Sequence, residues 1–296
     1  LDVLRELKAD ERLKHVPVIM LSALDEAGDV AQCLELGAED YLPKPFEPVI
    51  LRARINACLE HKRLRDREVE YLRQIEEKER RTDELLHVIL PAPIVAELKA
   101  TNTVAPRIRD NVAVMFVDIV NFTPYCVGRE PAEIVANLQA LVERYEELAA
   151  QHRLQKIKTI GDAFMAAAGL LEPLDNPVLN ATRCGLDMIA AATASKPGWE
   201  VRVGIHVGPV VAGLLGRRQY LFDLWGDTVN TAARMESYGQ PGCVTLSRDA
   251  WQRVEGLGRA ASLGLVDVKG KGRQEVFRFE GFLAAADHLT PQHPLL

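Results

Sequence analysis

The segment Leu51 to Leu90, near the middle of this chain, contains neither glycine nor proline and is dense in glutamate, arginine and lysine. Because these charged residues favour helix and the two strongest helix breakers are missing, the segment predicts one continuous helix. Pro91 and Pro93 end it, since proline removes a backbone donor and clashes with the preceding turn. We therefore expect one folded part on each side of a long helical segment.

One side of this helix carries an apolar row, made of Leu64, Tyr71, Ile75, Leu85 and Ile89. The row is consistent with a heptad repeat, but Glu68, Lys78 and Thr82 fall on the same seam, so a paired coiled coil would be weak. Two interpretations stay open. The segment is either a solvated helical spacer or a dimerising signalling helix whose marginal seam lets it shift between registers.

The composition is that of a globular protein of about two domains, with 296 residues, 48% of them hydrophobic and 26% charged. The net charge of -6 argues against nucleic-acid binding, which needs a basic face. The longest apolar stretch, Val16 to Leu24, is too short to span a membrane and no signal-peptide pattern opens the chain, so we expect a cytoplasmic protein. The five cysteines are scattered and form no C-x-x-C pair, which predicts reduced thiols rather than a zinc site or disulfides.

The first part of the chain has the pattern of a parallel α/β layer. Leu1 to Lys8 has helical spacing, and Val16 to Leu21 is a short apolar run typical of a strand buried on both faces. An amphipathic helix from Val30 to Leu36 stops at Gly37, and Tyr41 to Pro45 forms a strand end and turn before the next helix. The predicted order is αβαβα.

Two motifs in this part make it similar to a known family. They are "PVIMLSA", with Ser22 at the strand end, and "GAEDYLPKPF", with Lys44 before Pro45. They resemble the second half of a response-regulator receiver domain, in which such a hydroxyl and lysine contact a phosphoryl group on an aspartate. The resemblance places that aspartate upstream of Leu1. It implies that residues 1–60 are a partial receiver, and that a histidine kinase or phosphotransfer protein acts upstream of it.

After Arg109 the pattern changes to mixed strands and helices, which predicts an α+β domain. The expected elements are a strand at 112–120, a helix at 131–152, a hairpin at 155–160 and 163–168, a helix at 176–194, a strand at 201–207, a helix at 227–238, a strand at 243–246 and a closing hairpin at 265–268 and 275–279. The tail, residues 283–296, carries no clear signal.

Two aspartates in this domain stand at strand ends. Asp118 lies at the end of the apolar strand "VAVMFVDIV", where a carboxylate is costly to bury unless a positive charge compensates it. Asp162 occupies the turn of "KTIGDAFM". Either aspartate alone is typical of a cap or turn. Together they suit a pair of Mg²⁺ ions, which take one or two carboxylates and fill the remaining positions with phosphate oxygens and water. The turn from Ile119 to Thr123 leads into a helix, where backbone N–H groups can hold phosphates.

Five motifs make residues 106–279 resemble the catalytic domain of the class III nucleotidyl cyclases. They are "FVDIVNFT", "KIKTIGDAFM", "GIHVGPVVAGLLG", "FDLWGDTVNTAARMES" and "VKGKG", in the family's order and spacing. The resemblance implies an α+β domain with a ferredoxin-like βαββαβ core at residues 106–282, entered through a helical linker at 61–105. It also implies a homodimer whose active sites are built across the interface.

The resemblance also implies roles for individual residues. Metal binding, of two Mg²⁺ or Mn²⁺ ions per site, falls to Asp118, Asp162 and the carbonyl of Ile119. Substrate binding falls to Lys158 and Asp223, which contact the base from the partner subunit, to Lys269 and Lys271 on the terminal phosphates, and to Phe122 and Thr123 in the phosphate turn. The catalytic pair is Asn230, which orients the ribose, and Arg234, which stabilises charge at the reacting phosphate. Asn121 stands where many members carry glycine, and asparagine tolerates unusual backbone angles well.

The residues that face the base predict ATP as the substrate. Adenine offers an acceptor at N1 and a donor amine at C6, which complements Lys158 as donor and Asp223 as acceptor. Guanine reverses both groups, and such buried mismatches discriminate by ~10⁴ or more. Guanylyl members typically carry Glu and Cys at these positions. We therefore expect an adenylate cyclase that converts ATP to 3',5'-cyclic AMP and pyrophosphate under control of the receiver.

Two other interpretations differ from this one in the residues they require. A non-catalytic module that binds nucleotide or only dimerises would be favoured by loss of a metal-binding aspartate, Asn230 or Arg234, and all are present. A receiver-linked diguanylate cyclase would need a Gly-Gly-Asp/Glu-Glu-Phe run, which the sequence lacks. For Arg234 alone, a helix-surface ion pair with Glu236 is the simpler interpretation.

Overall fold

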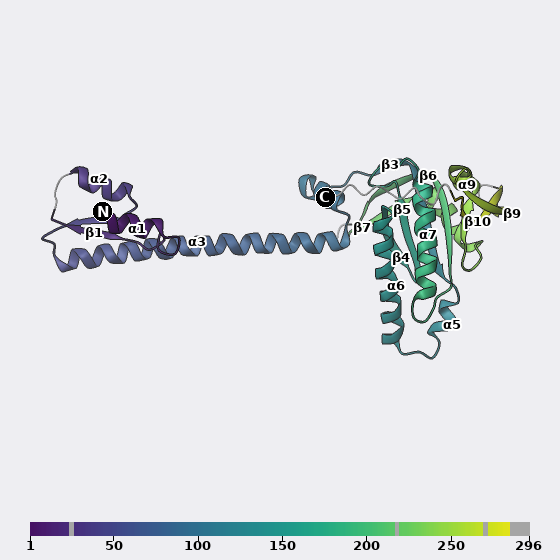
Figure 1. Cartoon of the computed structure of the whole chain (residues 1–296), viewed down its shortest axis with the longest axis horizontal. Helices are drawn as coiled ribbons and strands as arrows, with labels where there is room; N and C mark the ends of the chain where they lie inside the picture. Colours follow the sequence, from purple (N-terminus) through teal and green to yellow (C-terminus); the bar gives the residue numbers. More distant parts are fainter. Residues whose placement is uncertain (24–26, 217–218, 269–271, 285–296) are drawn as a thin grey trace. The chain divides into compact units, whose positions relative to one another are not determined.

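The structure is a computed structural model that describes residues 1–23, 27–216, 219–268 and 272–284. The chain divides into two compact units, Leu1–Ile89 and Leu90–Leu296 (Figure 1). No disulfide joins the five cysteines, as expected for reduced thiols.

The first unit contains a small parallel α/β layer. Its elements are α1 (Asp2–Ala9), β1 (Ile19–Ser22), α2 (Ala27–Glu35) and β2 (Asp40–Pro43), in the predicted order. Strands β1 and β2 pair in parallel, and the Lys44 N–H donates to the Ser22 carbonyl at 2.8 Å. The two residues that carry the receiver resemblance therefore lie side by side. Leu4, Cys33 and Ala38 form the buried core of this layer.

Helix α3 (Pro48–Ile89) continues from this layer without interruption for 42 residues, which confirms the prediction of one continuous helix. It begins three residues before the predicted start, because proline is well tolerated in the first turn of a helix. Most of its apolar side chains, including Leu64, Tyr71 and Leu85, are exposed. Within the residues that the structure describes, no helix is long and apolar enough to cross a membrane.

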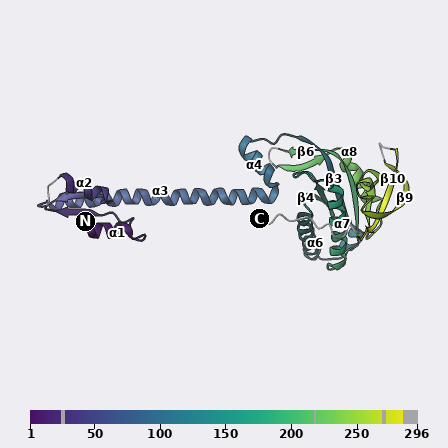
Figure 2. The same ribbon diagram turned by 45° about the horizontal axis from the view of Figure 1, so that its top comes forward.

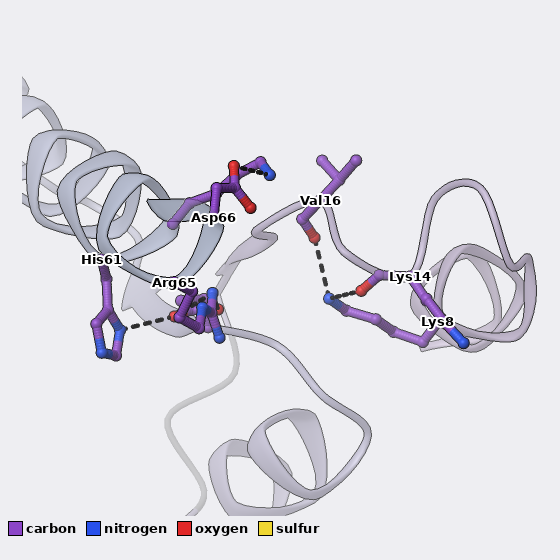
Figure 3. A network of polar contacts seen from close by, with 8 residues as sticks. Lys8, Lys14, Val16, His61, Arg65 and Asp66 are labelled. Carbon is purple, nitrogen blue, oxygen red and sulfur yellow. Dashed lines mark hydrogen bonds and ion pairs between the residues drawn. The ribbon is translucent and has the colours of Figure 1, made fainter. Parts of the chain in front are cut away.

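Ion pairs hold the first turns of α3 to the α/β layer (Figure 3). Glu39, just before β2, accepts hydrogen bonds from His61 Nδ1 at 3.0 Å and from Arg65 Nη2 at 2.9 Å, and Asp40 pairs with Arg54 at 2.9 Å. Burial raises the pKa of Glu39, but the hydrogen bonds from Arg65 and His61 outweigh it and leave that pKa below its usual value. We call Glu39, Asp40, Arg54, His61 and Arg65 the receiver clasp.

A second contact in the same figure secures the loop between α1 and β1. Lys8 donates from Nζ to the carbonyls of Lys14 and Val16, both at 3.0 Å (Figure 3). The loop thus satisfies two backbone acceptors with one side chain.

The second unit is built on an eight-stranded mixed sheet with the order β4-β5-β3-β6-β8-β10-β9, and β7 pairs with β6. The elements of its first half are α4 (Ala92–Thr101), β3 (Arg107–Ile119), α5 (Phe122–Cys126), α6 (Pro131–Gln151), β4 (Leu154–Ile160), β5 (Ala163–Ala168), α7 (Pro177–Ala194) and β6 (Val201–Leu215). The antiparallel order β4-β5-β3-β6, with α6 and α7 as the connecting helices, is the ferredoxin-like βαββαβ core that the sequence predicted.

The second half completes the sheet. Its elements are β7 (Leu221–Trp225), α8 (Asp227–Ser237), β8 (Val244–Ser247), α9 (Arg248–Val254), β9 (Gly258–Val268) and β10 (Gly272–Phe282). The strand expected at 201–207 is longer in the structure. It continues as β6 to Leu215, since β7 pairs with its second half. Strand β7 and helix α9 were not predicted.

Helix α4 and the full length of the closing hairpin also differ from expectation. Pro91 and Pro93 were expected only to end the long helix. In the structure Pro91 directly precedes α4 and Pro93 lies in its first turn, where a proline costs little. Strands β9 and β10 each run for 11 residues, beyond the short hairpin expected at 265–268 and 275–279.

The helices cover both faces of the sheet, and two neighbouring residues of β6 show how. A Cβ on Gly185 of α7 would lie 3.0 Å from Val203, whereas a Cβ on Gly204 would lie 1.9 Å from the backbone nitrogen of Glu236 in α8. Because successive strand residues point to opposite faces, α7 and α8 lie on opposite sides of the sheet (Figure 2). Only glycine at position 204 allows α8 to approach β6 this closely.

Candidate active site at the end of strand β3

The two predicted metal-binding aspartates lie together at one end of the sheet. Val117 on β3 pairs with Phe164 on β5, which puts Asp118 beside the β4–β5 turn that contains Asp162. A backbone hydrogen bond links Ile119 to the Asp162 carboxylate. Burial, followed by the charge of Asp118, raises the pKa of Asp162 above its usual value. The structure thus brings Asp118, Ile119 and Asp162 to one place.

An arginine that sequence analysis did not select faces this pair. Arg202 on β6 is directly opposite Asp118 in the antiparallel register, and its Nη2 lies 2.7 Å from Asp118 Oδ2. The same nitrogen lies 3.1 Å from Oε1 of Glu236. The signal that could have found Arg202 is its position as a lone cation in the apolar strand "VRVGIHV", because a half-buried carboxylate such as Asp118 needs a compensating charge.

Glu236 joins this cluster from α8. It is held against β6 at Gly204, and its burial, together with the nearby Asp118 charge, raises its pKa although Arg202 opposes the shift. Sequence analysis had considered Glu236 as an ion-pair partner of Arg234. The structure shows Glu236 in an ion pair with Arg202, on the same face of the sheet as Asp118.

The two residues predicted to contact the base also meet. Lys158 on β4 donates from Nζ to Asp223 Oδ2 on β7 at 2.5 Å. Asp223 is buried, and its other oxygen accepts the Leu224 N–H at 2.8 Å. The pair therefore presents a fixed donor and a fixed acceptor side by side.

The proposed catalytic residues lie on α8. Asn230 is exposed and Arg234 is half-buried one turn later, so both belong to one side of the helix. The start of α8 is fixed by Thr228, whose hydroxyl donates to the Pro209 carbonyl of β6 at 2.6 Å. Because α8 is anchored to β6 in this way, the side chains of Asn230 and Arg234 have a defined direction.

The turn after β3 has the predicted change from strand to helix. Asn121 adopts a left-handed conformation, φ 60°, and α5 begins at Phe122. The Phe122 ring packs against Trp199 with 5.9 Å between ring centroids, so its side chain belongs to the core, whereas Thr123 is exposed. Only the backbone of Phe122 is therefore placed to contact a phosphate. Lys269 and Lys271 lie outside the described residues.

The donor set at this end of β3 fits a hard divalent cation. Burial is the main cause of the raised pKa of Asp162, and the charge of the neighbouring Asp118 adds to it, so a bound cation would stabilise both carboxylates in their ionised form. Oxygen ligands of this kind are those that Mg²⁺ and Mn²⁺ take, with one or two carboxylates per site. No group of three or more His, Cys, Asp or Glu side chains suited to a metal occurs among the described residues, so a bound ion would depend on this pair of carboxylates, on backbone carbonyls and on oxygens from substrate or water.

The fold and this cluster define a nucleotide cyclase domain. A family described as the adenylate and guanylate cyclase catalytic domain matches residues 104–281, and the response regulator receiver domain matches residues 1–56. The chain belongs to the adenylate and guanylate cyclase family, and it carries a receiver-domain segment at its N-terminal side.

The proteins that resemble this chain include both adenylate cyclases and guanylate cyclases. Soluble guanylate cyclase subunit beta-2 of Homo sapiens is 35% identical over 206 residues, covering 68% of this chain and 33% of that protein. An adenylate cyclase of Mycobacterium tuberculosis is 37% identical over 213 residues, covering 70% and 48%. The guanylate cyclase domain of RhGC from Catenaria anguillulae, solved with GTP, is 32% identical with a TM-score of 0.58, covering 60% of this chain and 100% of that one. The chain thus spans a third to a half of the length of these two curated relatives.

Proposed function

We propose that this chain is an adenylate cyclase, which converts ATP to 3',5'-cyclic AMP and pyrophosphate. The observation that carries the proposal is the pair of Lys158 and Asp223, 2.5 Å apart. The lysine can donate to N1 of adenine and the aspartate can accept from its C6 amine. Guanine would set a donor against the lysine and a carbonyl oxygen against the carboxylate, leaving buried polar groups unpaired.

The other site residues then divide the remaining work. Asp118, Asp162 and the Ile119 carbonyl would hold two Mg²⁺ or Mn²⁺ ions, which supply acidity to the ribose 3'-hydroxyl and charge neutralisation at the leaving pyrophosphate. Asn230 orients the ribose by hydrogen bonding. Arg234, whose guanidinium is planar and always charged, stabilises charge that develops on the α-phosphate.

The triphosphate is bound by two further groups of donors. The backbone N–H groups at Phe122 and Thr123 lie at the start of α5, beside Asp118. Lys269 and Lys271 would hold the terminal phosphates.

We further propose that the enzyme works as a homodimer in which each site takes its metal-binding aspartates from one protomer and its base-reading and catalytic residues from the other. The family resemblance is the ground for this division. It assigns Lys158 and Asp162, which stand at the two ends of one short segment, to different sites.

We also propose that a phosphorelay signal from a histidine kinase or phosphotransfer protein regulates the enzyme through the receiver segment. Such an input, together with the ATP substrate, supports a cytoplasmic location. The adjacency of Ser22 and Lys44 supports the receiver function, and the receiver clasp supports a mechanical link to α3. We keep the division into a receiver at 1–60, a helical linker at 61–105, a catalytic domain at 106–282 and a tail as part of this proposal.

The direct test is to supply purified protein with ATP or GTP and with Mg²⁺ or Mn²⁺, and to measure both cyclic products. We expect cyclic AMP from ATP, with little cyclic GMP. A preference for GTP would contradict the base assignment, and no cyclic product from either nucleotide would favour a non-catalytic module.

A further inference from the structure

We propose that Arg202 competes with a divalent cation for Asp118, and that Glu236 is a positioning residue that draws Arg202 away from Asp118 and so sets the metal affinity of the site. The inference deepens the proposed function and rests on its assignment of Asp118 as a metal ligand. It concerns two residues to which no role has been assigned so far.

The competition follows from the contacts of one nitrogen atom. Arg202 Nη2 lies 2.7 Å from Asp118 Oδ2 in hydrogen-bond geometry, and 3.1 Å from Glu236 Oε1. A cation ligated by Asp118 must share that carboxylate with a guanidinium already in contact with it. Because like charges repel at this range, Arg202 lowers the affinity of Asp118 for any cation as long as it stays there.

Arg202 has unused hydrogen-bonding capacity on the side of Glu236. Its contact with Glu236 Oε1 lacks hydrogen-bond geometry, and both Arg202 Nε and Glu236 Oε1 are buried without a hydrogen-bond partner in the described part of the chain. Buried polar atoms of this kind are costly to leave unpaired. A small shift of the guanidinium toward Glu236 would satisfy them and release Asp118.

Glu236 is itself well fixed. Its backbone is seated against Gly204, where any larger residue would collide with it, and its other oxygen accepts the Ser237 hydroxyl at 3.2 Å. Only 12% of its side chain is exposed, compared with 29% for Arg202. Arg202 is therefore the mobile partner, and Glu236 is the fixed anchor.

The charges of the cluster leave room for a cation. The carboxylates of Asp118 and Glu236 contact the guanidinium of Arg202, and the charges of Asp118 and Arg202 both act on Asp162. If Glu236 holds Arg202, the two aspartates face the incoming ion without a competing charge. This arrangement would make Glu236 act on metal binding through Arg202 rather than as a ligand.

The test is a double-mutant cycle on the full chain, with Mn²⁺ alone as the probe and binding measured by electron paramagnetic resonance. We expect Arg202→Gln to tighten Mn²⁺ binding roughly tenfold, because it removes a competing charge next to Asp118. Glu236→Gln should weaken binding several-fold, because Arg202 then rests on Asp118 alone. In a protein that already carries Arg202→Gln, the fold-loss of Mn²⁺ affinity caused by Glu236→Gln should be at least about threefold smaller than in the parent. Such non-additive effects are expected when two residues are coupled.

Each other result would count against the proposal. Weaker Mn²⁺ binding in Arg202→Gln would mean that Arg202 supports Asp118 rather than competing with a cation. An equal or larger effect of Glu236→Gln without Arg202 would mean that Glu236 acts directly on the ion. If Arg202→Gln fails to fold by circular dichroism, Arg202→Met serves instead, because it also removes the positive charge while keeping a long unbranched side chain, and binding tighter than in the parent is again required.

Two controls separate this proposal from the proposed function. Asp118→Asn should abolish Mn²⁺ binding, so that the signal of free Mn²⁺ stays undiminished, and if it does not, the metal-site assignment itself fails. The pair of Arg248 and Glu275, 2.5 Å apart on α9 and β10, offers a matched ion pair in the same domain. Arg248→Gln and Glu275→Gln should leave Mn²⁺ binding unchanged.

Discussion

Lys158 and Asp223, 65 positions apart in the sequence, form a 2.5 Å ion pair in which the aspartate is buried and the lysine is half-buried. Each residue therefore fixes the direction of the other. A purine edge that inserts here meets one donor and one acceptor whose order is set by the fold, and this order distinguishes the two purines.

The double substitution Lys158→Glu with Asp223→Cys should shift the preference from ATP toward GTP, by at least about a hundredfold in the ratio of kcat/KM values, because it reverses the donor and acceptor order. Lys158→Glu alone should be more damaging than the double variant, since it sets two carboxylates against each other in a partly buried place. Rates of cyclic AMP and cyclic GMP formation measure the shift. Lys156→Glu, which alters the neighbouring lysine that pairs with Glu146, is the matched control and should keep the parent's preference.

Asp118→Ala or Asp162→Ala should lower metal-dependent turnover by at least about a hundredfold while the protein stays folded, because either change removes a carboxylate from the proposed metal site. Cyclase assays with thermal melting curves separate loss of chemistry from loss of fold. Asp110→Ala, at an exposed position on the same strand, should behave as the parent does. Activity within tenfold of the parent in either variant would contradict the two-metal assignment.

Two inactive chains should complement each other if the sites are shared between protomers. One chain would carry Asp118→Ala and Asp162→Ala, and the other Asn230→Ala and Arg234→Ala. A mixed dimer then holds one intact site and one doubly damaged site, so part of the activity should return on mixing. Mixtures that stay inactive, although a tag on each chain demonstrates the heterodimer, would refute the shared-site arrangement.

Stability in EDTA should depend on pH through Asp162. Burial and the Asp118 charge raise its pKa in the folded protein, so the folded state binds a proton more readily than the unfolded chain. This contribution to stability is present at low pH and is lost as pH rises through the raised pKa. Asp162→Asn should therefore melt a few °C higher than the parent at pH 7.5, and the difference should shrink toward pH 4. An Asn variant that melts lower at pH 7.5 would contradict this.

Loss of the receiver clasp should loosen the start of α3. Glu39→Gln removes the charge that Arg65 and His61 contact, and we expect faster hydrogen exchange of amides around residues 54–65 than in the parent. Because the pKa of Glu39 is lowered, the contribution of this carboxylate is present at neutral pH and is lost as pH falls through that lowered value. Glu60→Gln is the control, since its exposed contact with Arg63 spans 3.7 Å within the helix and should matter little. Equal exchange in both variants would argue against a clasp.

The sequence predicted those features that depend on local pattern. The absence of glycine and proline was enough to predict α3, and alternating or continuous apolar runs were enough to predict the core strands. Asp118 and Asp162 could be selected because a carboxylate at the end of an apolar strand is unusual. Arg202 and Glu236 were missed because their importance arises only from strand register and from the close approach of α8 at Gly204, which neighbouring residues in the sequence do not reveal.

The same reasoning explains the errors in element length. Strand β6 was expected to end at Val207, but hydrogen bonding to β7, which is distant in the local sequence pattern, extends it to Leu215. Helix α4 was obscured by two prolines that end one helix and begin another.

The unbroken course of α3 limits the kinds of signal it can carry. At a rise of 1.5 Å per residue, its 42 residues form a rod of about 63 Å without a proline or glycine hinge after the first residue. Such a rod resists bending, so the receiver signal that we propose would reach Ile89 as axial rotation or as a lengthwise displacement of the helix. Inserting residues into α3 should then alter the output according to the angular phase they add, at 100° per residue, rather than according to the distance alone.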